Sequence, residues 1–268
     1  MPFKLLTYNT TIKCNGSPEE KKKVMEVASF LKTREADIVI LNELGGMDEE
    51  NGIFSIFKRQ AGYEYGEIFP SNNEKSALAI LSREPFDSIY HEGMDFFWHS
   101  CRHIHYPHLD LAVFPTYLTP KDTNARNLEA DLIQEIVAST EASKILLAGT
   151  LNALPPEFSL EEDSGLAEQD KGVMKYTNSE NRICYHVINK MNSIFIDASS
   201  HQPNPNTAAY TVPTASNKNS SYIQPMRLDY VFLSNNLQDN LLSCNPVYDE
   251  VTDTLSDHYP IEAVFSSI

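Results

Sequence analysis

The sequence predicts a single α/β domain, residues 1–268, built on mixed β-sheets. Segments typical of strands alternate with segments typical of helices along the whole chain. No shift in composition marks a linker, and a chain of this length can bury a sizeable core. The most polar stretch, residues 203–224, is rich in Asn, Ser, Thr and Pro, and we interpret it as a surface loop over the functional site.

Strands are expected where short apolar runs are bounded by polar or turn-forming residues. Residues 38–41 are continuously apolar, as in a strand that is buried on both faces. Residues 144–149 form a similar run that ends at Gly149. The other expected strands are residues 3–8, 76–82, 109–114, 194–197, 228–233 and 261–265.

Helices are expected where apolar residues recur at intervals of three and four. The segment Ser17-Pro18-Glu19-Glu20 is typical of a helix start, because proline suits the first turn and acidic side chains suit the positive end of the helix dipole. Helical spacing is present in residues 24–31, 53–57, 127–139 and 182–191.

The composition is acidic, with 21 Lys and Arg against 37 Asp and Glu, and a net charge of −16. A surface with this charge repels the phosphate backbone of nucleic acid at long range. The polar stretch at residues 203–224 contains only Lys218 as a basic residue. We therefore expect a small phosphate ester as the partner, in preference to nucleic acid.

The cysteines point to a reducing compartment. Cys14, Cys101, Cys184 and Cys244 are scattered and form no Cys-x-x-Cys pair, which favours a reduced, cytoplasmic protein. No secretory signal is visible at the N-terminus, and no apolar stretch reaches membrane-spanning length. A monomer is expected, because no heptad pattern or long apolar edge is obvious.

Two segments that are far apart in the sequence carry the residue types of a metal-assisted hydrolytic site. Glu43 follows the apolar run at residues 38–41, and Asp257-His258 precede the expected strand at residues 261–265. A carboxylate can hold a hard cation, and an Asp–His pair can move a proton. The alternative for Glu43 is a surface glutamate at the end of a strand.

Several short segments follow one another in an order that is more specific than any one of them. Together they resemble the endonuclease/exonuclease/phosphatase family, the deoxyribonuclease I-like hydrolases. This resemblance implies a four-layer sandwich, in which two mixed β-sheets pack face to face, are flanked by helices and carry the site at one end. The matching segments are Leu6-Thr7-Tyr8-Asn9, residues 36–43, residues 77–83, residues 147–153, residues 227–234 and Ser256-Asp257-His258-Tyr259-Pro260.

The resemblance implies a divalent metal, Mg²⁺ or Mn²⁺, at the strand end. Glu43 would ligate this ion, and Asp257 lines the same pocket and is a second candidate ligand. Asn9 would support a metal-bound water or a phosphate oxygen. The alternative for Asn9 is a turn residue after the first strand.

The resemblance also implies an acid–base pair and a phosphate donor. His258 would act as general base or as a donor to the phosphoryl oxygen, and Asp229 would orient its ring. The alternative for Asp229 is an ion pair with Arg227. Asn152 would donate its amide to a phosphate oxygen, and its alternative is a cap before a proline turn.

Three further positions are less certain matches to the family pattern. Tyr117 lies where many members have His, and we expect it to contact the phosphate, because the abasic-site endonucleases of the family have Tyr there. Thr150 occupies the place of the motif's Asp, which orients the attacking water, so impaired catalysis is an expected alternative. Arg126 is a candidate substrate contact, and its alternative is a solvated side chain at a helix start.

One pattern falls outside the resemblance. His99, Cys101, His103 and His105 alternate, so on a strand they would share one face. Such residues suit zinc, but neighbouring side chains on one strand rarely complete a tetrahedron, and a polar strand face is the favoured interpretation.

The sequence thus supports two hypotheses about function. The first is a Mg²⁺-dependent phosphoesterase that hydrolyses a phosphate ester by in-line attack of water. The second is a catalytically degenerate relative that binds a phosphorylated ligand or a protein partner, and it rests on Thr150.

Overall fold

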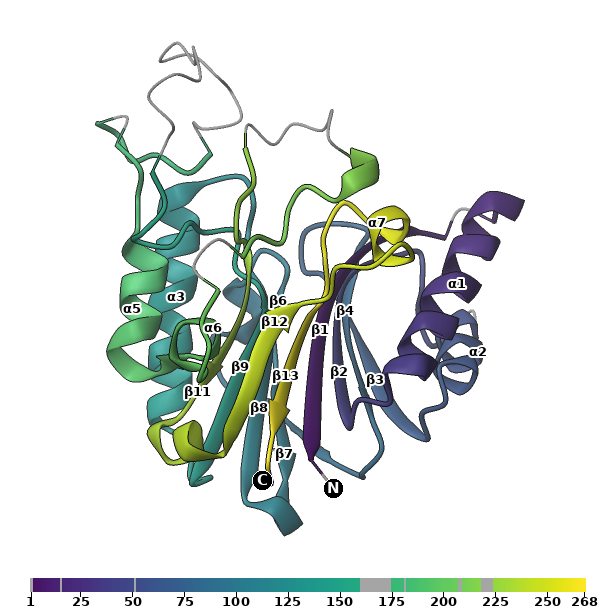
Figure 1. The fold of residues 1–268 in the computed structure, drawn as a ribbon, viewed down its shortest axis with the longest axis horizontal. Coiled ribbons are helices and arrows are strands. Elements are labelled where there is room, and N and C mark those ends of the chain that lie inside the picture. Colours follow the sequence, from purple (N-terminus) through teal and green to yellow (C-terminus); the bar gives the residue numbers. More distant parts are fainter. Residues whose placement is uncertain are drawn as a thin grey trace.

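Two β-sheets pack face to face in the computed structural model, with helices on both outer faces (Figure 1). The structure describes residues 2–14, 16–50, 52–159, 175–180, 182–206, 209–217 and 224–268. This arrangement confirms the expected four-layer α/β sandwich. None of the helices in these ranges is long and apolar enough to cross a membrane.

The first sheet is mixed and has the strand order β12-β13-β1-β2-β4-β3. Strands β1 and β2 run parallel, with Leu5 opposite Ile38, and the other neighbours run antiparallel. The strands are β1 (Phe3–Lys13), β2 (Ile38–Gly45), β3 (Tyr65–Pro70), β4 (Ala77–Ser82), β12 (Leu241–Pro246) and β13 (Ile261–Phe265).

The second sheet has the order β10-β11-β9-β8-β7-β5, and β6 also pairs with β8. Strands β8 and β9 run parallel, and the other pairs are antiparallel. The strands are β5 (Asp87–Ile89), β6 (Ser100–Cys101), β7 (His103–Tyr106), β8 (Leu111–Tyr117), β9 (Lys144–Thr150), β10 (Ile196–Asp197) and β11 (Asp229–Leu233).

Helices α1 (Pro18–Arg34) and α2 (Ile53–Gln60) cover the first sheet, and α3 (Thr123–Ala138) and α5 (His186–Ile194) cover the second (Figure 1). Helix α1 begins where the sequence predicts, because the Ser17 hydroxyl accepts a hydrogen bond from the backbone N–H of Glu20 at 3.2 Å. The short helices are α6 (Ala198–His201), α7 (Thr252–Leu255), and the 3₁₀ helices η1 (Met94–Phe96), η2 (Pro107–Leu109), η3 (Ala215–Asn217) and η4 (Asn235–Asn240).

Alternate residues of the central strands enter different layers, which explains their continuous apolar runs. In β2, Ile38 and Ile40 join the core between the sheets, whereas Val39 and Leu41 pack under the helices. Burying such side chains on both faces contributes about 1.5–3 kcal/mol for each fully buried one.

Most expected elements are present, with shifted ends. Helix α3 begins at Thr123, ahead of the expected residues 127–139, because Asp122 caps it by accepting from the Ala125 N–H at 2.7 Å. Helix α5 begins at His186, later than the expected residue 182. The sequence did not indicate β3, β5 or β12, which are short or rich in polar residues and proline.

The chain termini lie at one end of the sandwich, and the loops that follow β1, β2, β8 and β9 lie at the other (Figure 1). The described parts of the expected polar loop at residues 203–224, residues 203–206, 209–217 and 224, reach this second end. Within it, the Thr211 hydroxyl accepts hydrogen bonds from the backbone N–H groups of Leu228 at 3.0 Å and Asp229 at 3.3 Å. Lys218 lies outside the described residues.

Candidate functional site

Polar side chains from both sheets meet at the end opposite the termini. A chain of hydrogen bonds joins them: the amide of Asn9 donates to Glu43 at 3.0 Å and to Thr150 at 3.3 Å. Thr150 donates to Asp229 at 2.6 Å, and Asp229 holds His258 at 2.7 Å. These residues come from β1, β2, β9, β11 and the loop before β13, so only the folded chain assembles them.

Asp229 and His258 form a buried pair. Oδ2 of Asp229 lies 2.7 Å from Nδ1 of His258, and both side chains are buried. Burial alone lowers the pKa of an imidazole, but the charge and hydrogen bond of Asp229 outweigh it and raise the pKa of His258 to about 9. At neutral pH this histidine is therefore a cation and a hydrogen-bond donor.

The alternative role of Asp229 is not observed. Arg227 pairs instead with Asp197 at 2.7 Å and with Glu157 at 3.1 Å. The Asp229 carboxylate therefore forms hydrogen bonds with His258 and with the Thr150 hydroxyl, without competition from Arg227.

Glu43 is held by two neutral donors on one carboxylate oxygen. Oε1 accepts from Asn9 at 3.0 Å and from the Tyr117 hydroxyl at 2.7 Å. Among the described residues, none donates a hydrogen bond to Oε2. Glu43 has a φ of 58° and Asn152 has a φ of 50°, so both adopt the left-handed conformation at the end of a strand.

The donor set fits a hard cation that keeps most of its water. Glu43 offers an oxygen and is half-buried, so a hydrated ion can reach it. Mg²⁺ needs only one or two carboxylates together with waters and substrate oxygens. Within the described ranges, no three His, Cys, Asp or Glu side chains converge to hold a metal on their own. This excludes a closed zinc-type cage there, and it is consistent with an open magnesium site.

Ser256 joins the loop of Asp257 and His258 to strand β1. Its hydroxyl donates to the Asn9 carbonyl at 2.8 Å, and it accepts from the His258 N–H at 3.3 Å. The β1–β2 register shifts between Asn9 and Ile12, and Thr11 there has a φ of 45°. The bulge brings the Thr11 hydroxyl within 3.0 Å of Ser256.

Asp257 lies in a bend before β13. Its side chain is half-buried, and its negative charge acts on His258 together with that of Glu43. Its carbonyl accepts from the Thr214 N–H at 3.3 Å. Asp257 is thus placed beside the cluster, and its role as a metal ligand stays a prediction.

Thr150 is fully buried, and its hydroxyl is engaged on both sides. It donates to Asp229 and accepts from Asn9. Its one donor is used, so it could only accept from a water, and it carries no charge with which to take up a proton. The position that carries an acid in the family motif therefore acts here as a bridge between Asn9 and Asp229.

Asn152 lies next to the cluster, and Arg126 does not join it. The amide of Asn152 donates to the Leu118 carbonyl at 2.8 Å, and a second amide hydrogen remains for a ligand. Arg126 is 2% exposed and donates to the carbonyls of Thr119 at 2.8 Å and Lys175 at 2.6 Å. The prediction that Arg126 contacts the substrate is therefore wrong, and so is the alternative of a solvated side chain. The buried guanidinium of Arg126 joins two loops by hydrogen bonds.

Two lysines that the sequence gave no reason to single out lie near the carboxylates. Lys23 donates to the carbonyl of Thr11 at 3.1 Å, and Lys175 contacts the ring of Tyr176 at 5.1 Å. Burial lowers the pKa of both lysines, and the charge of Asp257 opposes this effect at each.

The histidine pattern forms no zinc site within the described residues. The strand is interrupted at Arg102, between β6 and β7. His99 stacks on the Tyr117 ring at 3.8 Å, whereas His103 stacks on Phe114 at 4.8 Å. The favoured interpretation as a polar strand face is also too simple, because His99 and His103 are buried in contact with aromatic rings.

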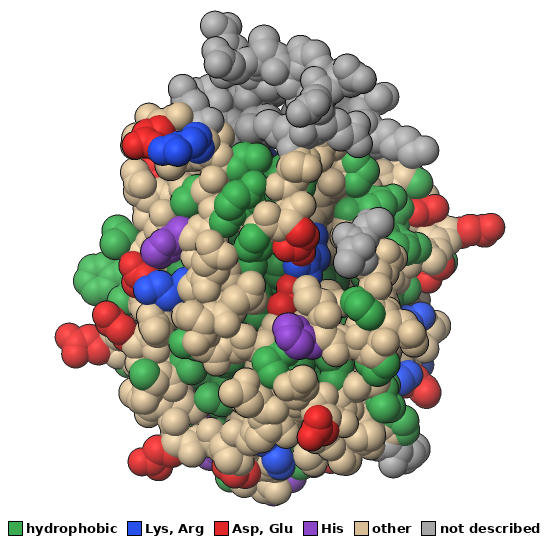
Figure 2. Space-filling model, turned by 60° about the vertical axis from the view of Figure 1, so that its left-hand side comes forward, with side chains coloured by type: hydrophobic (Ala, Val, Ile, Leu, Met, Phe, Trp, Pro, Cys, Tyr) green, Lys and Arg blue, Asp and Glu red, His purple; other side chains and the backbone are tan. Residues whose placement is uncertain are grey.

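The surface is consistent with the acidic composition. On the part of one face that is drawn in colour, Lys and Arg side chains are isolated from one another, and acidic and basic groups lie side by side near the centre (Figure 2). No broad basic strip is visible on that part of the face.

Comparisons with known proteins agree with this fold. A sequence profile described as the endonuclease/exonuclease/phosphatase family matches residues 12–258. A search of curated proteins found no match.

Solved structures share the fold along nearly the whole chain. An AP endonuclease from Archaeoglobus fulgidus is 16% identical, with 98% of this chain and 99% of that chain covered and a TM-score of 0.68. An endonuclease/exonuclease/phosphatase from Bacteroides vulgatus is 13% identical, with both chains fully covered (100%) and a TM-score of 0.69. A family protein from Leptotrichia buccalis is 15% identical, with 97% and 98% covered and a TM-score of 0.64.

Proposed function

Because the chain belongs to the endonuclease/exonuclease/phosphatase family, whose members hydrolyse phosphate esters, we propose that it is a phosphoesterase that depends on Mg²⁺ or Mn²⁺. The observation that carries this proposal is the chain of hydrogen bonds from Glu43 through Asn9, Thr150 and Asp229 to His258. It connects a candidate metal ligand with an acid–base pair at one end of the sandwich.

The proposed substrate is a small phosphate ester. The net charge of −16 disfavours loose binding to a nucleic acid backbone. Lys23 and Lys175 lie within the influence of Asp257 and would attract a single phosphate without forming a broad basic groove. A cytoplasmic location and a monomeric state stay predictions.

His258 and Asp229 would stabilise the transition state. Asp229 holds Nδ1, so Nε2 is the ring nitrogen that would meet the substrate. As an imidazolium, His258 would donate a hydrogen bond to a phosphoryl oxygen while negative charge develops there. The amide of Asn152 would donate to a second oxygen. These roles favour His258 as donor over His258 as general base.

Glu43, with Asp257 beside it, would hold the metal. When bound, Mg²⁺ neutralises charge on the phosphate and makes the phosphorus more open to attack by water. Asn9 and Tyr117 fix the Glu43 carboxylate by donating to the same oxygen. Their two bonds leave the other oxygen to face the ion.

A second candidate function rests on Thr150. This chain has Thr150 in place of the carboxylate that orients the attacking water in the family motif, and the hydroxyl of Thr150 is already engaged by Asp229 and Asn9. Losing a positioned acid–base group costs roughly 10²–10⁴-fold in rate. A relative that binds a phosphorylated ligand without turnover is therefore the alternative.

Hydrolysis of bis(4-nitrophenyl) phosphate in Mg²⁺ separates the two candidates. The phosphoesterase proposal expects turnover by the wild type that disappears in Glu43→Ala and His258→Ala. It also expects about a tenfold loss in Thr150→Val, which removes a donor from the buried Asp229 carboxylate. An inactive wild type that Thr150→Asp activates would establish the degenerate site instead. Calorimetry with Mg²⁺ alone then shows whether the silent protein still binds the ion.

A further inference from the structure

Glu129 is a buried carboxylate that the proposed chemistry at Glu43 and His258 does not use. It lies on helix α3 and is 3% exposed. Its Oε1 accepts from the backbone N–H of Trp98 at 2.6 Å, and its Oε2 accepts from the backbone N–H of Thr119 at 2.9 Å. One side chain therefore joins two segments that are separate in the sequence, one before β6 and one after β8.

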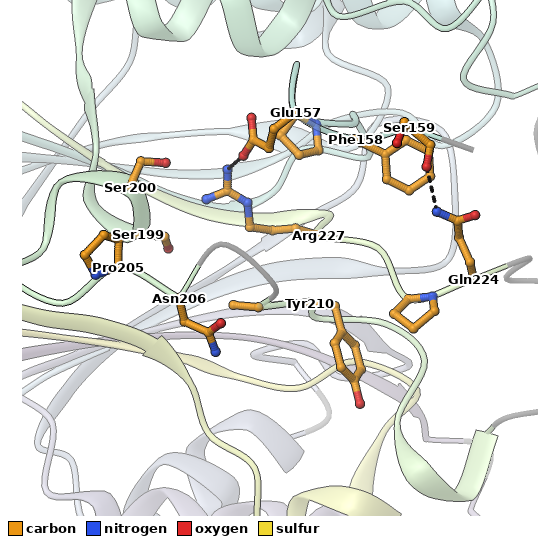
Figure 3. Close-up of a pocket in the computed structure, with 13 residues that line it drawn as sticks. Glu157, Phe158, Ser159, Ser199, Ser200, Pro205, Asn206, Tyr210, Gln224 and Arg227 are labelled. Carbon is orange, nitrogen blue, oxygen red and sulfur yellow. Dashed lines mark hydrogen bonds and ion pairs between the residues drawn. The ribbon is translucent and has the colours of Figure 1, made fainter. Parts of the chain in front are cut away.

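The charge of Glu129 is compensated in a different way from that of Arg227. Arg227 lies in the wall of a hollow of about 630 Å³ and pairs with Asp197 at 2.7 Å and with Glu157 at 3.1 Å. Figure 3 shows the Arg227 guanidinium and the Glu157 carboxylate pointing at each other. Both oxygens of Glu129 instead accept from the main chain, and hydrogen bonds to a charged group are about twice as strong as neutral ones. Glu129 thus fixes two stretches of backbone.

Both ends of this link lie next to a pair of stacked rings. Trp98 directly precedes His99, and Thr119 follows two residues after Tyr117. The rings of His99 and Tyr117 stack with centroids 3.8 Å apart and planes inclined by 7°. Strand β6 pairs with β8 here, but His99 lies just before β6 begins. The stack therefore depends on how the segment before β6 is held.

The segment before β6 is held by helix α3 and by residues 71–73. The Ser71 hydroxyl lies 3.0 Å from Nδ1 of His99, and the amide of Asn72 donates to the Phe97 carbonyl at 2.9 Å. Glu129 adds the bond from α3 to the backbone of the residue that precedes His99.

The backbone after Tyr117 is fixed to the same helix by both polar groups of one residue. Glu129 accepts from the Thr119 N–H, and Arg126 donates to the Thr119 carbonyl at 2.8 Å. Arg126 and Glu129 are three residues apart in sequence, so they share one face of α3. Helix α3 therefore supports both partners of the stack.

The Tyr117 ring connects this support to the candidate metal ligand. Its hydroxyl donates to Oε1 of Glu43 at 2.7 Å. Hydrogen bonds weaken steeply when their angle departs from linearity, so a small shift of the ring would weaken this one. Groups that orient a metal ligand in this way affect metal affinity without touching the ion.

We propose that Glu129 is a positioning residue for the candidate metal site, and that it acts on Glu43 through the His99–Tyr117 stack. This inference rests on the proposed phosphoesterase function and adds to it a residue that lies outside the site. Glu129 touches neither substrate nor metal. It fixes the backbone beside both rings and thereby the direction of the Tyr117 hydroxyl.

A double-mutant cycle on Mg²⁺ binding tests the inference. Calorimetry measures the dissociation constant of Mg²⁺ at about pH 8, because burial raises the pKa of Glu129 to about 7 and its carboxylate is then ionised. Glu129→Gln replaces one acceptor by an NH₂ group, so either Trp98 or Thr119 loses its partner. The dissociation constant should rise about threefold, less than for Tyr117→Phe, because Glu129 lies further from the ion.

The double variant decides whether the effect passes through Tyr117. If it does, Glu129→Gln should have no further effect on Mg²⁺ binding once Tyr117→Phe has removed the hydroxyl. A Glu129 that merely stabilises the fold would weaken binding by the same factor in both backgrounds. Equal factors, or a Glu129→Gln protein that binds Mg²⁺ as the wild type does, would overturn the inference.

Glu135→Gln is the matched control, since it makes the same change on the same helix at an exposed position. It should leave Mg²⁺ binding unchanged. An effect as large as that of Glu129→Gln would overturn the inference, because removing a negative charge from α3 would then be sufficient. If Glu129→Gln does not fold, Glu129→Asp takes its place in the cycle, because its shorter side chain cannot reach both N–H groups.

Failure of the phosphoesterase proposal is distinguishable from failure of this inference. A wild type that neither binds Mg²⁺ nor hydrolyses an ester contradicts the first proposal. The second is then tested without metal, by NMR of protein labelled with ¹³C at the tyrosine Cζ, whose chemical shift responds to the hydrogen bond that the hydroxyl donates. The Tyr117 signal, identified by its loss in Tyr117→Phe, should move in Glu129→Gln and stay in place in Glu135→Gln. A Tyr117 signal that Glu129→Gln leaves in place overturns the inference.

Discussion

Buried histidines lie in two places, His258 in the loop before β13 of the first sheet, and His99 and His103 beside and within strands of the second, and their surroundings differ. His258 has the carboxylate of Asp229 at 2.7 Å. His99 and His103 have aromatic rings as neighbours instead, and no described carboxylate accepts from either ring. Among the described residues, Nε2 of both lacks a hydrogen-bond partner.

The two surroundings drive the imidazole in opposite directions. Burial lowers the pKa of His99 and of His103 to about 4, so both are neutral at physiological pH. The same burial acts on His258, but the carboxylate of Asp229, aided by the charges of Asp257 and Glu43, reverses the outcome and raises its pKa to about 9. A histidine that is buried without an anionic neighbour is therefore neutral and contributes to packing. A histidine that is buried beside an anion is charged and can take part in catalysis.

The largest expected difference between the two groups is in catalysis. His258→Ala should lower kcat by roughly 10²–10⁴-fold, because the charged donor beside the phosphate is lost. His103→Phe should leave kcat unchanged, since that ring contacts Phe114, His91 and His105 and none of the candidate site residues. Steady-state kinetics with bis(4-nitrophenyl) phosphate measures both. Equal losses in the two variants would mean that the pairing with Asp229 does not distinguish them.

The next difference is in the pH dependence of stability. Between pH 6.5 and about 4, His99 and His103 bind more protons in the unfolded chain than in the folded chain. Their contribution to the free energy of unfolding is therefore fully present above pH 6.5 and is lost as the pH falls below it. Each contributes up to about 3 kcal/mol to this loss. For His258 the sign is reversed: its contribution is complete below pH 6.5 and is lost as pH rises through about 9.

Urea unfolding at a series of pH values measures the fall in stability at low pH, the acid limb, and the fall in stability at high pH, the alkaline limb. His103→Phe should flatten the acid limb and leave the alkaline limb in place. Asp229→Asn should remove the alkaline limb and leave the acid limb in place. Acid limbs of equal slope in His103→Phe and wild type would show that this ring is not held neutral by its surroundings.

The smallest expected effect concerns the contact between the two groups, where the Tyr117 ring stacks on His99 and its hydroxyl donates to Glu43. Tyr117→Phe keeps the stacking and removes the donor, so the Mg²⁺ concentration for half-maximal activity should rise about tenfold. Tyr106→Phe, in the core between the sheets, is the control and should leave it unchanged. A Tyr117→Phe enzyme with unaltered Mg²⁺ dependence would mean that this hydroxyl does not support the metal.

Residues that lie within one short segment could be proposed from the sequence. Glu43 and His258 each end or precede an apolar run, whereas Asp229 was grouped with them through the ordered motifs of the family resemblance, and the roles of all three stay predictions. The α/β class followed from strand and helix periodicities, which are local properties, whereas the four-layer sandwich was implied by the family resemblance. Residues 160–174, among others, lie outside the described ranges.

Contacts between segments could not be predicted in this way. The stacking of His99 on Tyr117 depends on β6 pairing with β8, a register that no local pattern specifies. Arg126 resembles a solvated helix-start residue until the loops at Thr119 and Lys175 close over it. Thr150 reads as a simple loss of a carboxylate, and only the fold reveals that its hydroxyl links Asn9 to Asp229.

The left-handed backbone at Glu43 has a consequence for how this molecule can change. A side chain with a Cβ in that conformation costs roughly 1 kcal/mol or more, and glycine would be free of that cost. Thermal stability and the proposed metal binding therefore make opposing demands on Glu43. Selection for thermal stability alone should favour glycine at this position. The selected variants would be more stable and would lack the proposed activity.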